Sequence, residues 1–143
     1  MRNIEELIEL WREAGNRLTP QRLAIFQVLY GNRSHPTAED IHQSLIGDYP
    51  SLSRNTVYST LDKLTKMGEI REVFIERSVS HFDPDDHPHA HTICRSCGRI
   101  EDIRLTPGSP LKSQVQSLKG FKAEKFQIVI SGLCRECKGK AGD

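Results

Sequence analysis

The sequence predicts an α+β protein with two domains, a helical N-terminal domain that ends in a β-hairpin and a smaller C-terminal α/β domain. Apolar residues recur at helical spacing as far as Met67, and shorter β-prone segments begin at Glu69. Four of the six histidines lie between His81 and Gly98, so potential metal ligands gather in the second half. A chain of 143 residues can form one ordinary domain or two small ones. We expect the domains to span residues 1–82 and 83–143.

The composition is typical of a soluble cytoplasmic protein. Hydrophobic residues make up 36% of the chain and charged residues 27%, and no apolar run is long enough to span a membrane. The N-terminal segment MRNIEELIELWREAG is charged throughout and lacks the apolar core of a signal peptide. In the cytoplasm, four cysteines more often bind metal than form disulfides. The net charge of +1 does not indicate a nucleic-acid partner, so a prediction of DNA binding must depend on local pattern.

Helix-capping signals divide the N-terminal half into helices. Residues 3–14 carry apolar side chains at helical spacing and end before Gly-Asn. Thr19 precedes Pro20, which is the usual order of an N-cap and a first helical residue. Thr37 is followed three residues later by Asp40, the spacing of a capping box. We therefore expect three helices before residue 50.

A fourth helix and the segment after it predict a winged helix-turn-helix. The helix follows Ser53 and ends at Gly68, where glycine supplies the usual C-terminal stop. Two β-prone segments, 69–76 and 79–83, then form a hairpin or wing. In this architecture the last helix enters the major groove of DNA and its first residues meet base edges.

The first turns of this fourth helix carry the candidate DNA-binding residues. Arg54 can pair with guanine, and Thr56 and Tyr58 can touch a thymine methyl group. Asn55 lies on the same polar side. An amphipathic packing helix with a solvated polar face would show the same pattern, because residues 1–80 hold ten basic and eleven acidic residues. The pattern alone leaves both interpretations open.

Two C-x-x-C pairs predict a structural zinc site. Cys94-Arg-Ser-Cys97 and Cys134-Arg-Glu-Cys137 are separated by 36 residues. Four thiolates complete a tetrahedral zinc shell and leave no open coordination position, so the site is expected to stabilise the fold and not to catalyse. Two disulfides or a thioredoxin-like site are the alternatives, and the expected cytoplasmic location and the absence of a βαβ pattern argue against both.

The residues between the two pairs predict a small α/β unit. Residues 99–105 alternate as a strand, residues 109–120 show helical spacing after Ser-Pro, and residues 121–133 return as a strand. The core of such a unit is thin. A unit of this size commonly gains core by pairing with a copy of itself, so we expect a homodimer.

Histidines and aspartates around the first C-x-x-C pair form a second candidate metal site. His89 and His91 alternate, so their side chains share one face of a strand. Asp83 precedes them by a short loop and Asp102 follows one strand later. Mixed nitrogen and oxygen ligands favour iron(II), manganese or zinc. A solvated turn at residues 83–86 and ordinary surface histidines would also explain the pattern.

Several motifs resemble the ferric uptake regulator family in order and spacing. The resemblance covers about residues 15–137 and is carried by RLTPQRLAIFQVL, HPTAEDI, PSLSRNTVYSTLDKLTKMG, HFD, HPHAHTICRSCGRIED and GLCREC. It implies a homodimeric, metal-dependent bacterial transcription factor, in which domain 1–82 binds double-stranded DNA at a palindromic operator. Domain 83–143 is implied to dimerise and to bind structural zinc through the four cysteines.

The resemblance also implies a regulatory Fe(2+) or Mn(2+) site made of His35, Asp83, His89, His91 and Asp102. His35 enters this set only through the resemblance. Iron-responsive members of the family usually carry glutamate where this sequence has Asp83 and Asp102. Aspartate at both positions resembles the peroxide-sensing repressors, which implies oxidation of a ligand imidazole, here His35 or His89. The alternative is an iron-responsive repressor of metal-uptake genes.

Two other classes of function fit part of the pattern. A metal-dependent hydrolase or a thiol oxidoreductase could use the histidine–aspartate set or one C-x-x-C pair. A hydrolase also needs a general base near an open metal position, and Glu101 would point away from Asp102 across the strand. We therefore expect that the protein is not an enzyme. A zinc-ribbon interaction module without DNA contact is the remaining possibility.

Overall fold

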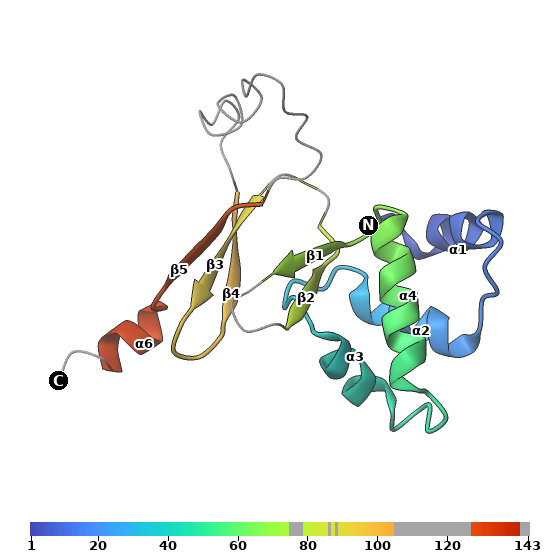
Figure 1. Cartoon of the computed structure of the whole chain (residues 1–143), viewed down its shortest axis with the longest axis horizontal. Helices are drawn as coiled ribbons and strands as arrows, with labels where there is room; N and C mark the ends of the chain where they lie inside the picture. Colours follow the sequence, from blue (N-terminus) through green and yellow to red (C-terminus); the bar gives the residue numbers. More distant parts are fainter. Residues whose placement is uncertain (75–78, 86, 88, 105–126, 141–143) are drawn as a thin grey trace, which may run out of the picture. The chain divides into compact units, whose positions relative to one another are not determined.

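The computed structural model describes residues 1–74, 79–85, 87, 89–104 and 127–140, which belong to two compact units, Met1–Asp86 and His87–Asp143 (Figure 1). Helices and a hairpin make up the first unit, and a three-stranded sheet with a short helix makes up the described part of the second. The predicted α+β class is confirmed. This division falls four residues after the predicted boundary at 82/83, and the functional roles of the two domains stay predictions. Within the described ranges, no helix combines the length and apolar character needed to cross a bilayer.

The helices of the first unit begin at capping residues. In each case the side chain before the helix accepts a hydrogen bond from the backbone N–H three residues later, which satisfies one of the donors left open at a helix start. The capping box of Thr37 and Asp40 is present, as predicted. The helices and their caps are α1 (Ile4–Glu13, Asn3), α2 (Pro20–Leu29, Thr19), α3 (Ala38–Leu45, Thr37) and α4 (Arg54–Lys66, Ser53).

The hydrophobic core of the first unit lies between these helices. The Trp11 and Phe26 rings pack edge to face with centroids 5.2 Å apart, and neither side chain is exposed. Val57, Leu61 and Leu64 face this core from α4, so its opposite face carries the polar residues. Because the buried residues of α4 begin at Val57, the start of this helix lies at the surface.

A β-hairpin completes the first unit. Strands β1 (Arg71–Phe74) and β2 (Ser80–Asp83) pair antiparallel, and residues 75–78 lie outside the described part of the chain. A bridge between Thr37 and His81 and a 3.0 Å hydrogen bond from Phe82 N to Pro36 O tie β2 to the loop before α3. This attachment brings the His35 loop beside the end of β2.

The second unit contains a sheet with strand order β4-β3-β5. The central strand β3 (His89–Cys94) is antiparallel to β4 (Ile100–Arg104) and parallel to β5 (Val129–Gly132). Helix α6 (Arg135–Lys140) follows β5 and was not predicted, because its six residues show no apolar periodicity. The helix predicted at 109–120 lies outside the described residues. Residues 121–126 of the last predicted strand also lie outside them.

Candidate metal centres and nucleic-acid interface

Strand pairing brings the two C-x-x-C segments together in the second unit. Cys94 ends β3 and pairs with Gly132 of the parallel strand β5, and Cys134 follows two residues later. After Cys94 the chain turns back at Gly98, whose φ of 75° lies in the left-handed region that favours glycine. Cys137 lies in α6. The sheet therefore places two short turns, each with two thiols, next to each other.

The four sulfurs have the spacing of a zinc shell. All four Sγ atoms lie within 4.8 Å of one another, Cys97 Sγ is 3.8 Å from Cys134 Sγ, and none of the four is in a disulfide. Sulfurs at about 2.3 Å from a tetrahedral ion would be about 3.8 Å apart. A disulfide would need about 2.05 Å. The donor set and its spacing therefore fit one tetrahedral ion.

Local hydrogen bonds change the acidity of the thiols. Backbone N–H groups of Cys134 and Cys97 donate to Cys94 Sγ and lower the pKa of this thiol to about 6. A hydrogen bond with the Ser96 hydroxyl lowers the pKa of Cys137. The contacts of Cys137 with the Cys134 and Cys97 thiols outweigh this effect and raise the Cys137 pKa to about 11. Four thiolates this close repel one another, so a cation is needed for all of them to be deprotonated together.

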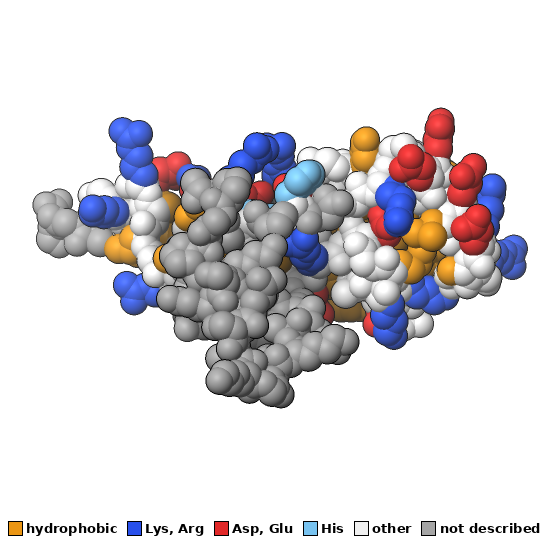
Figure 2. Space-filling model, turned by 90° about the horizontal axis from the view of Figure 1, so that it is seen from above, with side chains coloured by type: hydrophobic (Ala, Val, Ile, Leu, Met, Phe, Trp, Pro, Cys, Tyr) orange, Lys and Arg blue, Asp and Glu red, His pale blue; other side chains and the backbone are white. Residues whose placement is uncertain are grey.

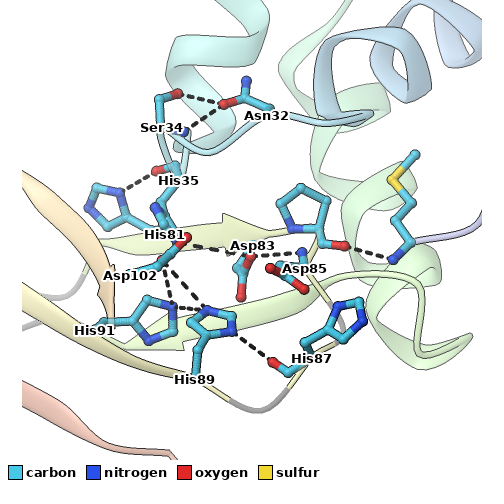
Figure 3. A network of polar contacts seen from close by, with 12 residues as sticks. Asn32, Ser34, His35, His81, Asp83, Asp85, His87, His89, His91 and Asp102 are labelled. Atoms are coloured by element: carbon cyan, nitrogen blue, oxygen red, sulfur yellow. Dashed lines mark hydrogen bonds and ion pairs between the residues drawn. The ribbon is translucent and has the colours of Figure 1, made fainter. Parts of the chain in front are cut away.

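His89, His91 and Asp102 form one group in the second unit (Figure 3). His89 Nε2 is 2.9 Å from His91 Nε2, and Asp102 Oδ1 lies 3.6 Å and 3.8 Å from these two nitrogens. Strand β4 supplies the carboxylate because Asp102 pairs directly with His91 in the register. Two nitrogens bound at right angles to one ion at about 2.1 Å would be about 3.0 Å apart. Two imidazoles and one carboxylate are the donor set of many iron(II) sites.

The His89 tautomer also suits metal binding. His89 Nδ1 donates to the His87 carbonyl oxygen at 2.7 Å, which leaves the lone pair of the neutral ring on Nε2. A metal-ligating histidine usually donates its other ring N–H to a carbonyl or carboxylate in this way. The backbone of His87 therefore orients His89, which is a role that the sequence did not reveal.

His35 and Asp83 form a second group, in the first unit (Figure 3). His35 Nε2 is 3.9 Å from Asp83 Oδ1, and both side chains are at most 2% exposed. The Asp85 backbone N–H donates to the same carboxylate oxygen at 2.8 Å. His35 has a φ of 51°, in the left-handed region that costs a residue with Cβ about 1 kcal/mol. The surrounding structure must hold this conformation in place.

His81 is one of the residues that holds it. His81 Nδ1 donates to the His35 carbonyl oxygen at 2.7 Å, and the bridge from His81 to Thr37 spans the same loop. Because the contact is made between residues far apart in the sequence, no local pattern could indicate it. His81 thus connects the wing hairpin to the loop that carries His35.

The candidate DNA-binding residues lie in the first turns of α4. Arg54, Asn55 and Tyr58 are exposed and Thr56 is half-buried, where it contacts the Ser53 cap. Arg54 is held by Glu39 of α3, a contact that the sequence analysis missed. Acidic and basic side chains are interspersed over the face of the first unit seen in Figure 2, so this face shows no patch of a single sign.

Comparison with known proteins identifies the family. The model of the ferric uptake regulator family matches residues 13–131. The peroxide-responsive repressor PerR of Staphylococcus aureus (strain USA300) is 36% identical over 137 residues, which are 96% of this chain and 93% of the relative. The match extends over both compact units.

Solved structures share the fold. The ferric uptake regulator Fur of Helicobacter pylori superposes with a TM-score of 0.79 at 24% identity, covering 94% of this chain and 91% of that one. PerR from Streptococcus pyogenes superposes with a TM-score of 0.55 at 27% identity, covering 96% and 94%. The resemblance inferred from sequence motifs is confirmed: the chain belongs to the ferric uptake regulator family.

Proposed function

We propose that this chain is a homodimeric, metal-dependent transcriptional repressor that senses peroxide through an iron(II) site. The observation that carries the proposal is the group of His89, His91 and Asp102, in a chain that is 36% identical to a peroxide-responsive repressor. Four cysteines without a disulfide suit a reducing compartment, which supports the cytoplasm as its location. The relatives are named as regulators, and we assign no enzymatic turnover to this chain.

The four-cysteine cluster is proposed to hold structural zinc. The sulfur spacing of 3.8 Å supports this assignment, and so does the complete thiolate shell. Cys94 and Cys97 would hold the end of β3, and Cys134 and Cys137 the start of α6. Zinc bound there would stabilise the end of a small sheet in which, among the described strands, only β3 is mostly buried.

The histidines and aspartates are proposed to form one regulatory site with ligands from both units. His35 and Asp83 supply one nitrogen and one oxygen, too few to hold an ion tightly, and His89, His91 and Asp102 supply the rest. An ion bound by both groups stabilises one arrangement of the two units over all others. In a dimer this arrangement sets the separation of the two α4 helices, and hence the half-site spacing that the protein can recognise.

Peroxide sensing is proposed to end this arrangement chemically. Iron(II), when bound, supplies the redox chemistry that allows peroxide to oxidise a nearby imidazole. His35 or His89 would gain one oxygen atom and lose its value as a nitrogen donor. The two units would no longer share an ion, and the operator would be released.

The test is mass spectrometry of the iron-loaded protein before and after peroxide, with DNA binding measured on the same samples. We expect one added oxygen on His35 or His89 together with loss of operator binding. The manganese-loaded protein should keep unmodified histidines and full operator binding. His42, which hydrogen-bonds to the Leu52 carbonyl within the helical core, is an internal control that should stay unmodified. If the histidines stay intact while chelation still releases DNA, the protein is an iron-responsive repressor instead.

DNA recognition is proposed to use the first turns of α4. The exposure of Arg54 and Tyr58 supports this, because both side chains lie at the start of α4 where they are accessible to a partner. Arg54→Ala and Tyr58→Ala should each weaken operator binding about 10-fold or more, without changing metal content or the oligomeric state. Unchanged DNA binding in both variants would favour an interaction module that makes no contact with DNA through this helix.

A further inference from the structure

The guanidinium of Arg54 is held in one orientation by a carboxylate on the neighbouring helix. Arg54 Nε donates to Glu39 Oε2 and Arg54 Nη2 donates to Glu39 Oε1, both at 2.8 Å. Gln43, one turn further along α3, donates to Glu39 Oε1 at 2.9 Å. The carboxylate is therefore fixed from two sides, and the arginine plane is fixed with it.

This ion pair is poorly placed to stabilise the fold. The Arg54 and Glu39 side chains are 61% and 46% exposed, and exposed pairs contribute little because solvent screens them and side-chain entropy is lost. Hydrogen bonds from Arg54 and then Gln43 hold the pKa of Glu39 at about 2, so the pair is ionised at any physiological pH. A contact that fixes an exposed arginine at the start of α4 needs another explanation.

The geometry of the Arg54–Glu39 pair suggests a role in binding a base. Glu39 occupies the inner edge of the guanidinium, made of Nε and one Nη2 hydrogen. The outer edge has a second pair of parallel N–H groups, on Nη1 and Nη2, which matches the O6 and N7 acceptors of guanine. An arginine held in this way meets a base with its side-chain entropy already lost.

We propose that Glu39 is a specificity-determining residue, which orients Arg54 toward a guanine and disfavours DNA that lacks one at this position. The inference rests on the proposed DNA binding through α4. The discrimination against DNA without a guanine follows from charge. Where no guanine accepts hydrogen bonds from Arg54, the Glu39 carboxylate only repels nearby phosphates. Specific affinity and non-specific affinity should therefore respond to Glu39 in opposite directions.

The experiment uses the metallated full-length protein and an operator selected from random duplexes by the wild type. Glu39→Gln keeps the shape of the side chain but removes its charge. The matched control is Asp62→Asn, which removes a somewhat more exposed charge that pairs with Lys66 on the same helix α4. Affinities for the selected operator and for a scrambled duplex are measured at two salt concentrations.

We expect Glu39→Gln to lower the operator-to-scrambled affinity ratio about 10-fold, with tighter binding to the scrambled duplex. Reselection with this variant should yield operators that have lost preference at one guanine, the same position that Arg54→Ala loses. Asp62→Asn should shift both affinities together and leave their ratio unchanged.

The possible failures are separate. A wild type without operator preference, or an Arg54→Ala variant that keeps full preference, contradicts the proposed mode of DNA binding. An Arg54→Ala variant that loses preference while Glu39→Gln keeps it overturns only the role of Glu39. Equal changes in Glu39→Gln and Asp62→Asn also overturn it, because the effect would then be one of net charge.

Discussion

The four-cysteine cluster and the histidine–aspartate set are built in different ways. All four cysteines belong to the second unit, and only Cys94 is buried. The histidine–aspartate set is divided, with His35 and Asp83 in the first unit and three residues in the second. Its histidines are at most 9% exposed. The cysteine set gathers its ligands at one end of a sheet, whereas the histidine–aspartate set has four buried donors and the more exposed Asp102 on two separate units.

This difference suggests different uses for a bound metal. An ion with all of its ligands in one unit stabilises that unit alone, so it suits a permanent structural site. An ion with ligands in two units couples their arrangement to metal binding, so it suits a switch. Burial has a consequence too, because buried imidazoles and carboxylates favour a bound cation more strongly than exposed ones do.

The largest effect is expected from loss of a cysteine ligand. Cys97→Ser should reduce zinc from about one ion per chain to a small fraction and prevent the second unit from folding, because a structural zinc site is coupled to folding. The first unit should stay folded. Trp11, the only tryptophan in the chain, is buried there, so its fluorescence reports on the first unit alone.

Ser96→Ala is the matched control: it removes the hydroxyl that contacts Cys137 but none of the four sulfurs, so it should retain most of the zinc. A Cys97→Ser protein with full zinc content and a folded second unit would show that the cluster is not the structural site. Equal loss of Trp11 burial would show instead that the two units fold as one.

The next largest effect is expected at His89. His89→Ala removes one nitrogen donor, so the affinity for the regulatory metal should fall about 100-fold or more while structural zinc remains. Metal content would fall from two ions per chain to one, as measured by elemental analysis. His87→Ala is the control, because His87 contributes its backbone carbonyl to His89 and this carbonyl survives the substitution. Equal losses in both variants would argue against ligation by His89.

His35→Ala tests the division of the set between two units. The three residues of the second unit would still bind an ion, so affinity should fall only about 10-fold to 100-fold. The dependence of DNA binding on the metal should nevertheless weaken strongly, because Asp83 would then be the one proposed ligand left in the first unit. Titrations of metal and of DNA on the same protein separate the two effects. Metal-dependent DNA binding that is undiminished at saturating metal would contradict the bridging role of His35.

Local chemistry explains which parts of this molecule the sequence predicts. The caps at Thr19 and Thr37 were predicted because a capping side chain bonds to a backbone group three residues away. Each C-x-x-C pair was recognised because its two cysteines are also only three residues apart. That the two pairs meet depends on the parallel pairing of β3 with β5, which no local pattern contains.

Contacts between distant residues account for what sequence reasoning missed. His35 entered the candidate site only through family resemblance, because its left-handed conformation and its approach to Asp83 depend on the wing. The pair of Glu39 and Arg54 joins two helices across fifteen residues of sequence. The His81 ring donates to the His35 carbonyl, and the His87 carbonyl accepts from the His89 ring. A sequence pattern cannot show which carbonyl oxygen an imidazole ring will contact.

The smallest effect is expected at His81, which acts on the divided set from a distance. His81→Ala removes the donor that holds the His35 carbonyl, so the regulatory metal affinity should fall about 10-fold, with zinc content unchanged. His81→Asn should restore most of this loss, because the Asn amide N–H occupies nearly the position of the imidazole Nδ1–H and can donate to the same oxygen. A general structural role would predict equal loss of thermal stability and of metal affinity in both variants. Rescue by asparagine, but not by the longer glutamine, would show that the position of His35, and through it the coupling of the two units, depends on this single hydrogen bond.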